Sequence, residues 1–221
     1  MRGVNRKLAL IPAILLLALC IPAVKWGLAD LNAYTTRHEV SKWESENRLP
    51  VPEELTKARV AIETALNWSR APEYYDYLGR LHHYNALISD NPLLKSTALQ
   101  EALVSYRHSN SLRPQWPYTQ ANIALIKAKS GEFDQEYQHM IRQSVSSGPW
   151  ENGVNIALTE AGLLGWLSLN MDERKMIIDN IRRGIRRNPD HIKVILNRYN
   201  KRSLICANLQ RDVYQRKLCG V

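Results

Sequence analysis

The chain lacks the short motifs that carry familiar enzyme chemistry. Its ten glycines form neither GxGxxG nor GxxxxGK, the patterns by which glycine-rich loops bind phosphate groups. Asp-x-Asp, Gly-x-Ser-x-Gly, His-Glu-x-x-His and Cys-x-x-Cys are absent as well. The one histidine pair, His82-His83, points in two directions about 100° apart on a helix, which disfavours a shared metal ion. The sequence therefore predicts a protein that is not an enzyme and has no catalytic, cofactor-binding or metal-binding residues.

Long apolar runs are also scarce, because a single segment near the N-terminus is long enough to cross a bilayer. Leu8–Val24 is an uninterrupted apolar run of 17 residues, and a spanning helix needs roughly 17–25. Arg2, Arg6 and Lys7 precede it, which predicts a cytoplasmic N-terminus and an exported body. We expect residues 1–29 to form a basic tip and a bacterial inner-membrane anchor, with the body in the periplasm.

The same segment fits a second interpretation, a signal peptide that is removed after export. Gly27 and Ala29 are the small residues that such cleavage needs, so processing after Ala29 is the alternative to an anchor. Pro12 and Pro22 inside the apolar run disfavour a signal peptide. Lys25-Trp26 at the end of the run favours an anchor, because both residue types are typical of the membrane interface.

The net charge of +9 is concentrated at the C-terminal end. Residues 180–221 contain eleven Lys and Arg against two Asp, whereas residues 1–179 are balanced. Arg182-Arg183 and Arg186-Arg187 lie at i, i+4 spacing and form a like-charged ridge, which favours an anionic partner. Anionic lipid, an acidic polysaccharide or an acidic protein fits this charge. Nucleic acid is excluded for an exported body, and a solvated helix face is the alternative.

Of the three cysteines, only Cys206 and Cys219 lie in the body. In an oxidising compartment two such thiols predict one disulfide. A loop of this length stabilises the fold by about 3 kcal/mol in the chain-entropy model. We expect this bond to hold the C-terminal tail in place.

The remaining sequence predicts a succession of helices separated by proline and glycine, without the alternating pattern of strands. Residues 30–51 predict a helical stalk that ends in a linker containing Pro50. Residues 52–190 predict paired helices, and residues 191–221 predict a basic C-terminal helical segment.

Residues 117–150 resemble a tetratricopeptide repeat, which is a pair of antiparallel helices. Ala124 stands where that family has a small residue between its helices, Gly131 stands at the turn, and Phe133 follows it. Glu136 replaces the usual alanine of the second helix. The resemblance implies an all-α fold, with an N-terminal transmembrane helix followed by a tetratricopeptide-like helical-repeat domain that has a concave surface.

Aromatic residues are abundant apart from phenylalanine, with six Trp and ten Tyr. Their rings serve either helix packing or stacking on sugars. Trp116 and Trp150 lie beside prolines at the predicted repeat junctions. The candidates for contact with a ligand or partner are Trp116, Tyr118, Trp150, Arg182, Arg183, Arg186 and Arg187.

The order of parts resembles the VpsP-type exopolysaccharide-biosynthesis proteins. The shared features are a basic N-terminus, one membrane segment, a tetratricopeptide-like body and the junction Leu112-Arg113-Pro114-x-Trp116-Pro117-Tyr118. The resemblance implies a non-enzymatic scaffold that holds protein components of the envelope polysaccharide machinery near the inner membrane. Two alternatives are open: a scaffold for a pilus or secretion system, and a protein that binds an anionic polysaccharide directly.

Overall fold

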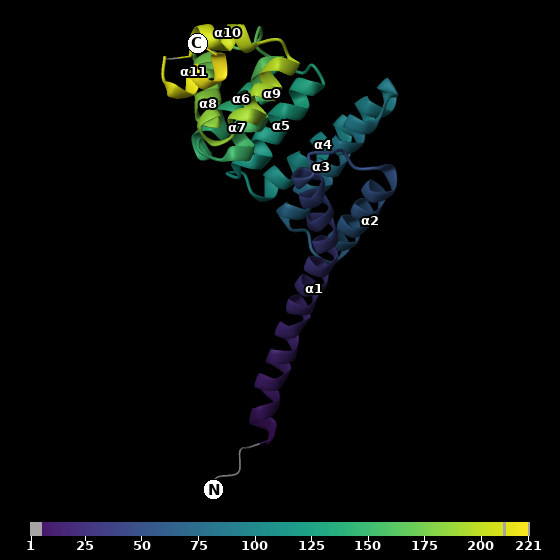
Figure 1. Cartoon of the computed structure of the whole chain (residues 1–221). Coiled ribbons are helices and arrows are strands. Elements are labelled where there is room, and N and C mark those ends of the chain that lie inside the picture. The colour runs from purple at the N-terminus through teal and green to yellow at the C-terminus, as the bar shows by residue number, and fades with distance from the viewer. Residues whose placement is uncertain (1–5, 210, 221) are drawn as a thin grey trace.

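The computed structural model describes residues 6–209 and 211–220, and this part of the chain is all-helical (Figure 1). The helices of the described residues are α1 (Arg6–Ser45), α2 (Pro52–Trp68), α3 (Pro72–Ile88), α4 (Pro92–Leu112), α5 (Pro117–Lys129), α6 (Gln135–Ser147), α7 (Asn152–Leu164), α8 (Met171–Arg187), α9 (Pro189–Arg198), α10 (Arg202–Asn208) and α11 (Val213–Cys219). The predicted architecture, an apolar N-terminal helix followed by packed helix pairs, is confirmed.

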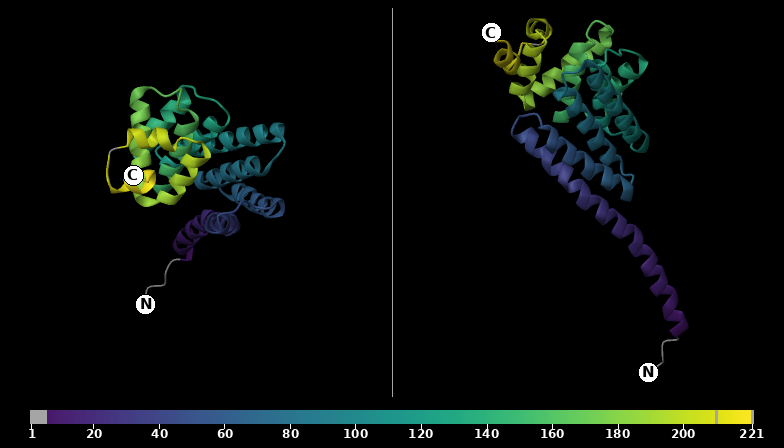
Figure 2. Two further views of the ribbon diagram at one scale, coloured as in Figure 1. Left: turned by 45° about the horizontal axis from the view of Figure 1, so that its top comes forward. Right: turned by 90° about the vertical axis from the view of Figure 1, so that its right-hand side faces the viewer.

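Helix α1 runs without interruption from the apolar segment into the body. Within the described residues it is the one helix long and apolar enough to cross a membrane. Its side chains are exposed over Ile14–Val24, where the helix projects from the body (Figure 2). Further along, Ala29, Ala33 and Trp43 are fully buried against α2. The C-terminal half of α1, expected to form a stalk, therefore packs as part of the body.

Proline and capping side chains set the helix starts. Helices α2, α3, α4, α5 and α9 each begin at a proline, whose fixed φ suits the first turn. Helix α8 begins with a capping box, in which Asn170 and Glu173 each accept the other's backbone N–H. These local signals divide the chain into short helices that fold back on one another.

The helices form successive pairs, α1–α2, α3–α4, α5–α6 and α7–α8, and each pair packs on the next. Helix α5 lies against both α4 and α7, and α9 continues beside α7 and α8. Helices α3 and α4 are longer than those of the following pair, and the tip of their hairpin extends beyond its neighbours (Figure 1).

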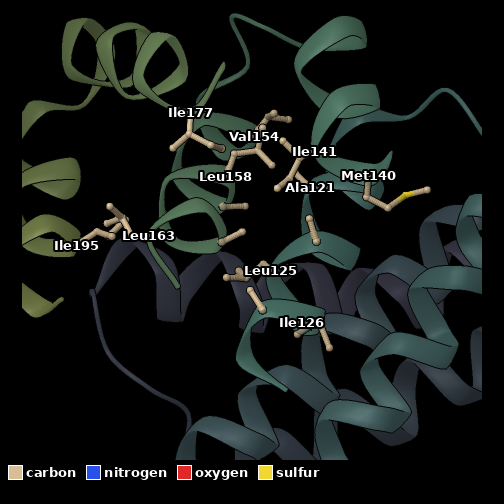
Figure 3. Packing of buried hydrophobic residues seen from close by; sticks show 14 of the residues in the cluster. Ala121, Leu125, Ile126, Met140, Ile141, Val154, Leu158, Leu163, Ile177 and Ile195 are labelled. Carbon is tan, nitrogen blue, oxygen red and sulfur yellow. The ribbon is translucent and has the colours of Figure 1, made fainter. Parts of the chain in front are cut away.

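Small residues allow the close approach of paired helices, as predicted for Ala124, which is fully buried. At Gly79 on α3, an added Cβ would lie 2.9 Å from the ring of Tyr106 on α4. Gly131 has a φ of 74°, a left-handed conformation that turns the chain from α5 to α6. Figure 3 shows part of the larger core, including Val154, Ile177 and their neighbours.

The predicted disulfide between Cys206 and Cys219 is confirmed. It joins α10 to α11, with 5.9 Å between the two Cα atoms. Arg202 on α10 also donates hydrogen bonds to the carbonyl oxygen of Leu218 on α11. The C-terminal segment is thus closed into one unit, and α11 packs on α8.

Candidate functional site

A cleft of about 380 Å³ lies between α3 and α5. Its volume falls near the lower end of the range of about 300–1,000 Å³ for ligand sites. The cleft is lined by Glu73, Asp76, Tyr77, Arg80, Arg113, Trp116, Tyr118 and Asn122. None of these described lining residues is aliphatic. A second cavity, between α2 and α3, measures only about 120 Å³.

Helix periodicity brings the lining residues together. Glu73, Tyr77 and Arg80 follow one another at spacings of four and three residues and share one face of α3. Pro117 begins α5, so Tyr118 and Asn122 lie one turn apart on the opposite wall. The turn between α4 and α5 closes the cleft from a third side.

In that turn, Arg113 and Trp116 form a stacked pair. The guanidinium carbon of Arg113 lies 3.4 Å from the centroid of the Trp116 ring. Arg113 caps the end of α4 and Trp116 caps the start of α5, so the backbone of both residues is fixed by the helices. The Nε atom of Arg113 is buried and has no hydrogen-bond partner among the described residues. The pair presents a permanent positive charge whose planar shape matches a carboxylate.

Asp76 is a half-buried carboxylate on α3 at the wall of the cleft. Its carboxylate accepts a hydrogen bond of 2.7 Å from the hydroxyl of Thr119. Burial raises the pKa of Asp76, while hydrogen bonds from Thr119 and Ser109 and the charge of Arg113 oppose that rise. The carboxylate therefore offers acceptor atoms next to the free guanidinium.

The other two charged residues of the cleft are bound to α1. Glu73 accepts a hydrogen bond of 3.2 Å from Arg37, and Arg80 donates one of 2.8 Å to Glu44. Of the two described cations that line the cleft, Arg113 is thus the one without an ion pair.

Tyr118 connects the cleft to the turn between α6 and α7. Its hydroxyl donates a short hydrogen bond to Glu151, and burial together with this bond raises the pKa of Tyr118 to about 12. Trp150, next to Glu151, is 53% exposed. The guanidinium of Arg183 on α8 lies over the Trp150 ring at 5.9 Å, and burial lowers the pKa of Arg183.

The four arginines of the predicted ridge do not form one surface, because they contact different parts of the fold. Arg182 forms an ion pair of 3.4 Å with Asp212, and Arg186 lies 5.3 Å from the centroid of the Tyr214 ring on α11. Arg183 lies toward Trp150, with its Nε and Nη2 atoms buried and without partners among the described residues. Arg187 is exposed near the end of α8.

Of the seven predicted contact residues, Trp116 and Tyr118 line the cleft, and Trp150 with Arg183 lies beside it across the Tyr118–Glu151 bond. The sequence did not predict the remaining polar members of the cleft, which are Glu73, Asp76, Arg80, Arg113 and Asn122. The position of Arg113 within the Trp116-Pro117-Tyr118 junction was the one local signal that pointed to it.

No family model, curated protein or solved structure matches this chain. The comparisons therefore identify no family. The class defined by the fold is that of an all-α protein of packed helix pairs with an apolar N-terminal helix.

Proposed function

We propose that the chain is a non-enzymatic, single-pass inner-membrane protein whose periplasmic body supports exopolysaccharide synthesis or export. The body would hold protein components of that machinery close to the membrane. The order of parts, resembling that of the VpsP-type proteins, suggests the process. The Cys206–Cys219 disulfide supports an oxidising compartment.

The continuity of α1 is the observation that carries this proposal. Ala29 and Ala33 are buried against the body in the same helix that contains the apolar segment. Cleavage after Ala29 would remove one of these buried residues and separate the body from its first helix turn. The packing therefore favours a retained anchor over a signal peptide.

The same helix sets the distance between the membrane and the cleft. Arg37, which binds Glu73 at the cleft, follows Trp26 by eleven positions on α1. At about 1.5 Å per residue, this corresponds to about 16 Å along the helix axis. A partner bound there is kept near the membrane surface, which raises its local concentration without any further contact.

The proposal is tested by deleting the gene and measuring cell-bound and secreted polysaccharide. We expect the polymer to be lost or shortened, and to be restored by the full chain. A body of residues 26–221, which keeps the buried Ala29 and is exported with a cleavable signal peptide, should not restore it. A matched control is the full chain with Leu167, an exposed residue between α7 and α8, replaced by Ser.

Immunoblots under non-reducing conditions establish that each form is exported and carries its disulfide. Unchanged polysaccharide in the deletion strain would overturn the assignment to polysaccharide assembly, and crosslinking in cells would then identify another envelope machine. Full rescue by the unanchored body would overturn the role of the anchor.

A further inference from the structure

We propose that the cleft between α3 and α5 binds a carboxylated sugar, such as a uronic acid unit of an acidic polysaccharide. Arg113 would pair with the carboxylate, and the rings of Tyr77, Trp116 and Tyr118 would face the sugar. This inference deepens the proposed function and rests on it for the compartment in which such a polymer is met.

The lining chemistry selects a sugar over a peptide side chain. A sugar ring combines an apolar C–H face with a rim of hydroxyl groups. The cleft combines three aromatic rings with the amide of Asn122 and the carboxylate of Asp76, which can hydrogen-bond to hydroxyls. An aliphatic side chain would instead find no aliphatic partner among the described lining residues.

The charges of the cleft select a singly charged anion. Arg113 lies over the Trp116 ring and has no ion-pair partner among the described residues, so its charge is available to pair with a carboxylate. Asp76 and Glu73 lie in the same cleft, so a doubly charged phosphate is repelled more strongly than a carboxylate. A carboxylate therefore fits this balance better than a phosphate monoester.

A second aromatic–arginine pair extends the site beyond one sugar unit. Trp150 with Arg183 lies next to Glu151, which Tyr118 binds at the edge of the cleft. Trp116 lies directly before the start of α5 and Trp150 lies two residues before the start of α7, so both pairs lie along one edge of the helix array. A polymer could contact the two pairs in succession.

The test is isothermal titration calorimetry on the full chain in neutral detergent micelles. The acidic probes are hexasaccharides of galacturonate, of mannuronate and of hyaluronan, and the neutral probes are cellohexaose and maltohexaose. We expect at least one acidic probe to bind with at least about tenfold higher affinity than the neutral probes, because hydrogen bonds to charged groups are the stronger ones. Its affinity should fall as the salt concentration is raised.

Substitutions then determine the sign of the ligand's charge. Arg113→Ala should weaken binding by about tenfold or more. Asp76→Asn should strengthen the binding of an anion, because it removes a negative charge beside it, and would weaken the binding of a cation. Arg174→Ala is the matched control: Arg174 also lies over an indole ring, that of Trp166 at 5.6 Å, but lies outside the cleft. Thermal melts establish that each variant is folded.

Equal binding of acidic and neutral probes, an unchanged affinity in Arg113→Ala, or no binding of any probe would overturn the inference. Arg113-dependent binding of phosphatidylglycerol vesicles without binding of the oligosaccharides would overturn it in favour of a lipid headgroup. These outcomes are independent of the deletion experiment. Loss of polysaccharide without oligosaccharide binding removes the cleft assignment alone, and binding without any polysaccharide phenotype removes the proposed cellular function.

Discussion

The buried charge of Lys127 gives the sharpest stability prediction. Lys127 lies on α5 with only 1% of its side chain exposed. Its Nζ atom lies 2.9 Å from Glu132, 2.9 Å from Asp134 and 3.1 Å from Glu136, all at or after the turn into α6. Burial by itself lowers the pKa of Lys127, but hydrogen bonds to the three carboxylates outweigh it and leave this pKa raised. One ammonium group thus fixes the turn of the α5–α6 pair.

Replacing Lys127 with Met keeps an unbranched side chain and removes the charge. Three carboxylates then remain, and Arg107 compensates only Glu136. Breaking a buried ion pair costs about 3–5 kcal/mol. The side chains of Glu132, Asp134 and Glu136 are 38%, 56% and 30% exposed. Because water screens these charges, we expect the free energy of unfolding to fall by about 3 kcal/mol, the lower end of that range. For a chain of this size this corresponds to a fall in Tm of about 6–12 °C.

The pH dependence gives an independent signature. The pKa values of Glu132 and Glu136 are lowered by hydrogen bonds, chiefly from Lys127 and from Arg107 respectively. A carboxyl group with a lowered pKa stabilises the fold above its unfolded pKa, and this contribution disappears as pH falls through the folded value. The raised pKa of Lys127 contributes stability at all pH values below its unfolded pKa. The wild type should therefore lose stability below about pH 4.5, and Lys127→Met should lose less.

The assay is thermal unfolding followed by circular dichroism in detergent, at pH 7 and at several acidic values. Lys175→Met on the exposed face of α8 is the control and should change stability by less than about 0.5 kcal/mol. Adding Glu132→Gln to Lys127→Met should recover part of the loss, since it removes one uncompensated charge. A Tm within about 2 °C of the wild type, which is roughly the effect of a neutral surface substitution, would refute the reasoning.

Three further predictions concern the disulfide, a close contact between two helices and a buried histidine. Replacing both Cys206 and Cys219 with Ala should destabilise the C-terminal segment by about 3 kcal/mol, seen as faster hydrogen exchange in α10 and α11 but not in α3. Gly162→Ala would place a Cβ 2.7 Å from Ile177 and should cost about 1–3 kcal/mol, measured by thermal melts; an unchanged Tm would contradict this close packing. Burial lowers the pKa of His83 from 6.5 to about 3, so protons favour the unfolded state between these values. His83→Gln should therefore reduce the loss of stability between pH 6.5 and pH 4. If Tm falls equally with pH in the variant and the wild type, His83 is not the source of this loss.

The helical pairs were predictable because their signals are local. A proline at the first position of a helix, a glycine with positive φ at a turn and a small residue at a helix crossing each act within a few residues of the chain. Gly131 and Ala124 occupy the expected positions for these reasons. The disulfide was predictable from the number of cysteines in the body and from the apolar N-terminal segment, which led us to expect an oxidising compartment.

The cleft was less predictable because its parts come from distant segments. The packing of α3, α4 and α5 brings Asp76 and Arg113 together. The two residues are far apart in the sequence, so no local motif predicts that they line one cleft. In the arginine ridge, by contrast, residues that are close in the sequence have different partners in the fold. Arg182 and Arg183 are neighbours in sequence, but adjacent helical residues point to different sides. Arg182 therefore pairs with Asp212 at the start of α11, whereas Arg183 lies over the ring of Trp150.

The ion pairs between α1 and α3 connect the cleft directly to the apolar N-terminal helix. Arg37 and Glu44 are seven positions apart on α1, and they bind Glu73 and Arg80, which are also seven positions apart on α3. Seven residues correspond to about two helical turns, so the two bonds keep the helices in register over that length. Each exposed pair contributes little alone, but both act on helices already packed through a common core. Glu73 and Arg80 line the cleft, so their partners on α1 connect it to the same helix that contains the apolar N-terminal segment.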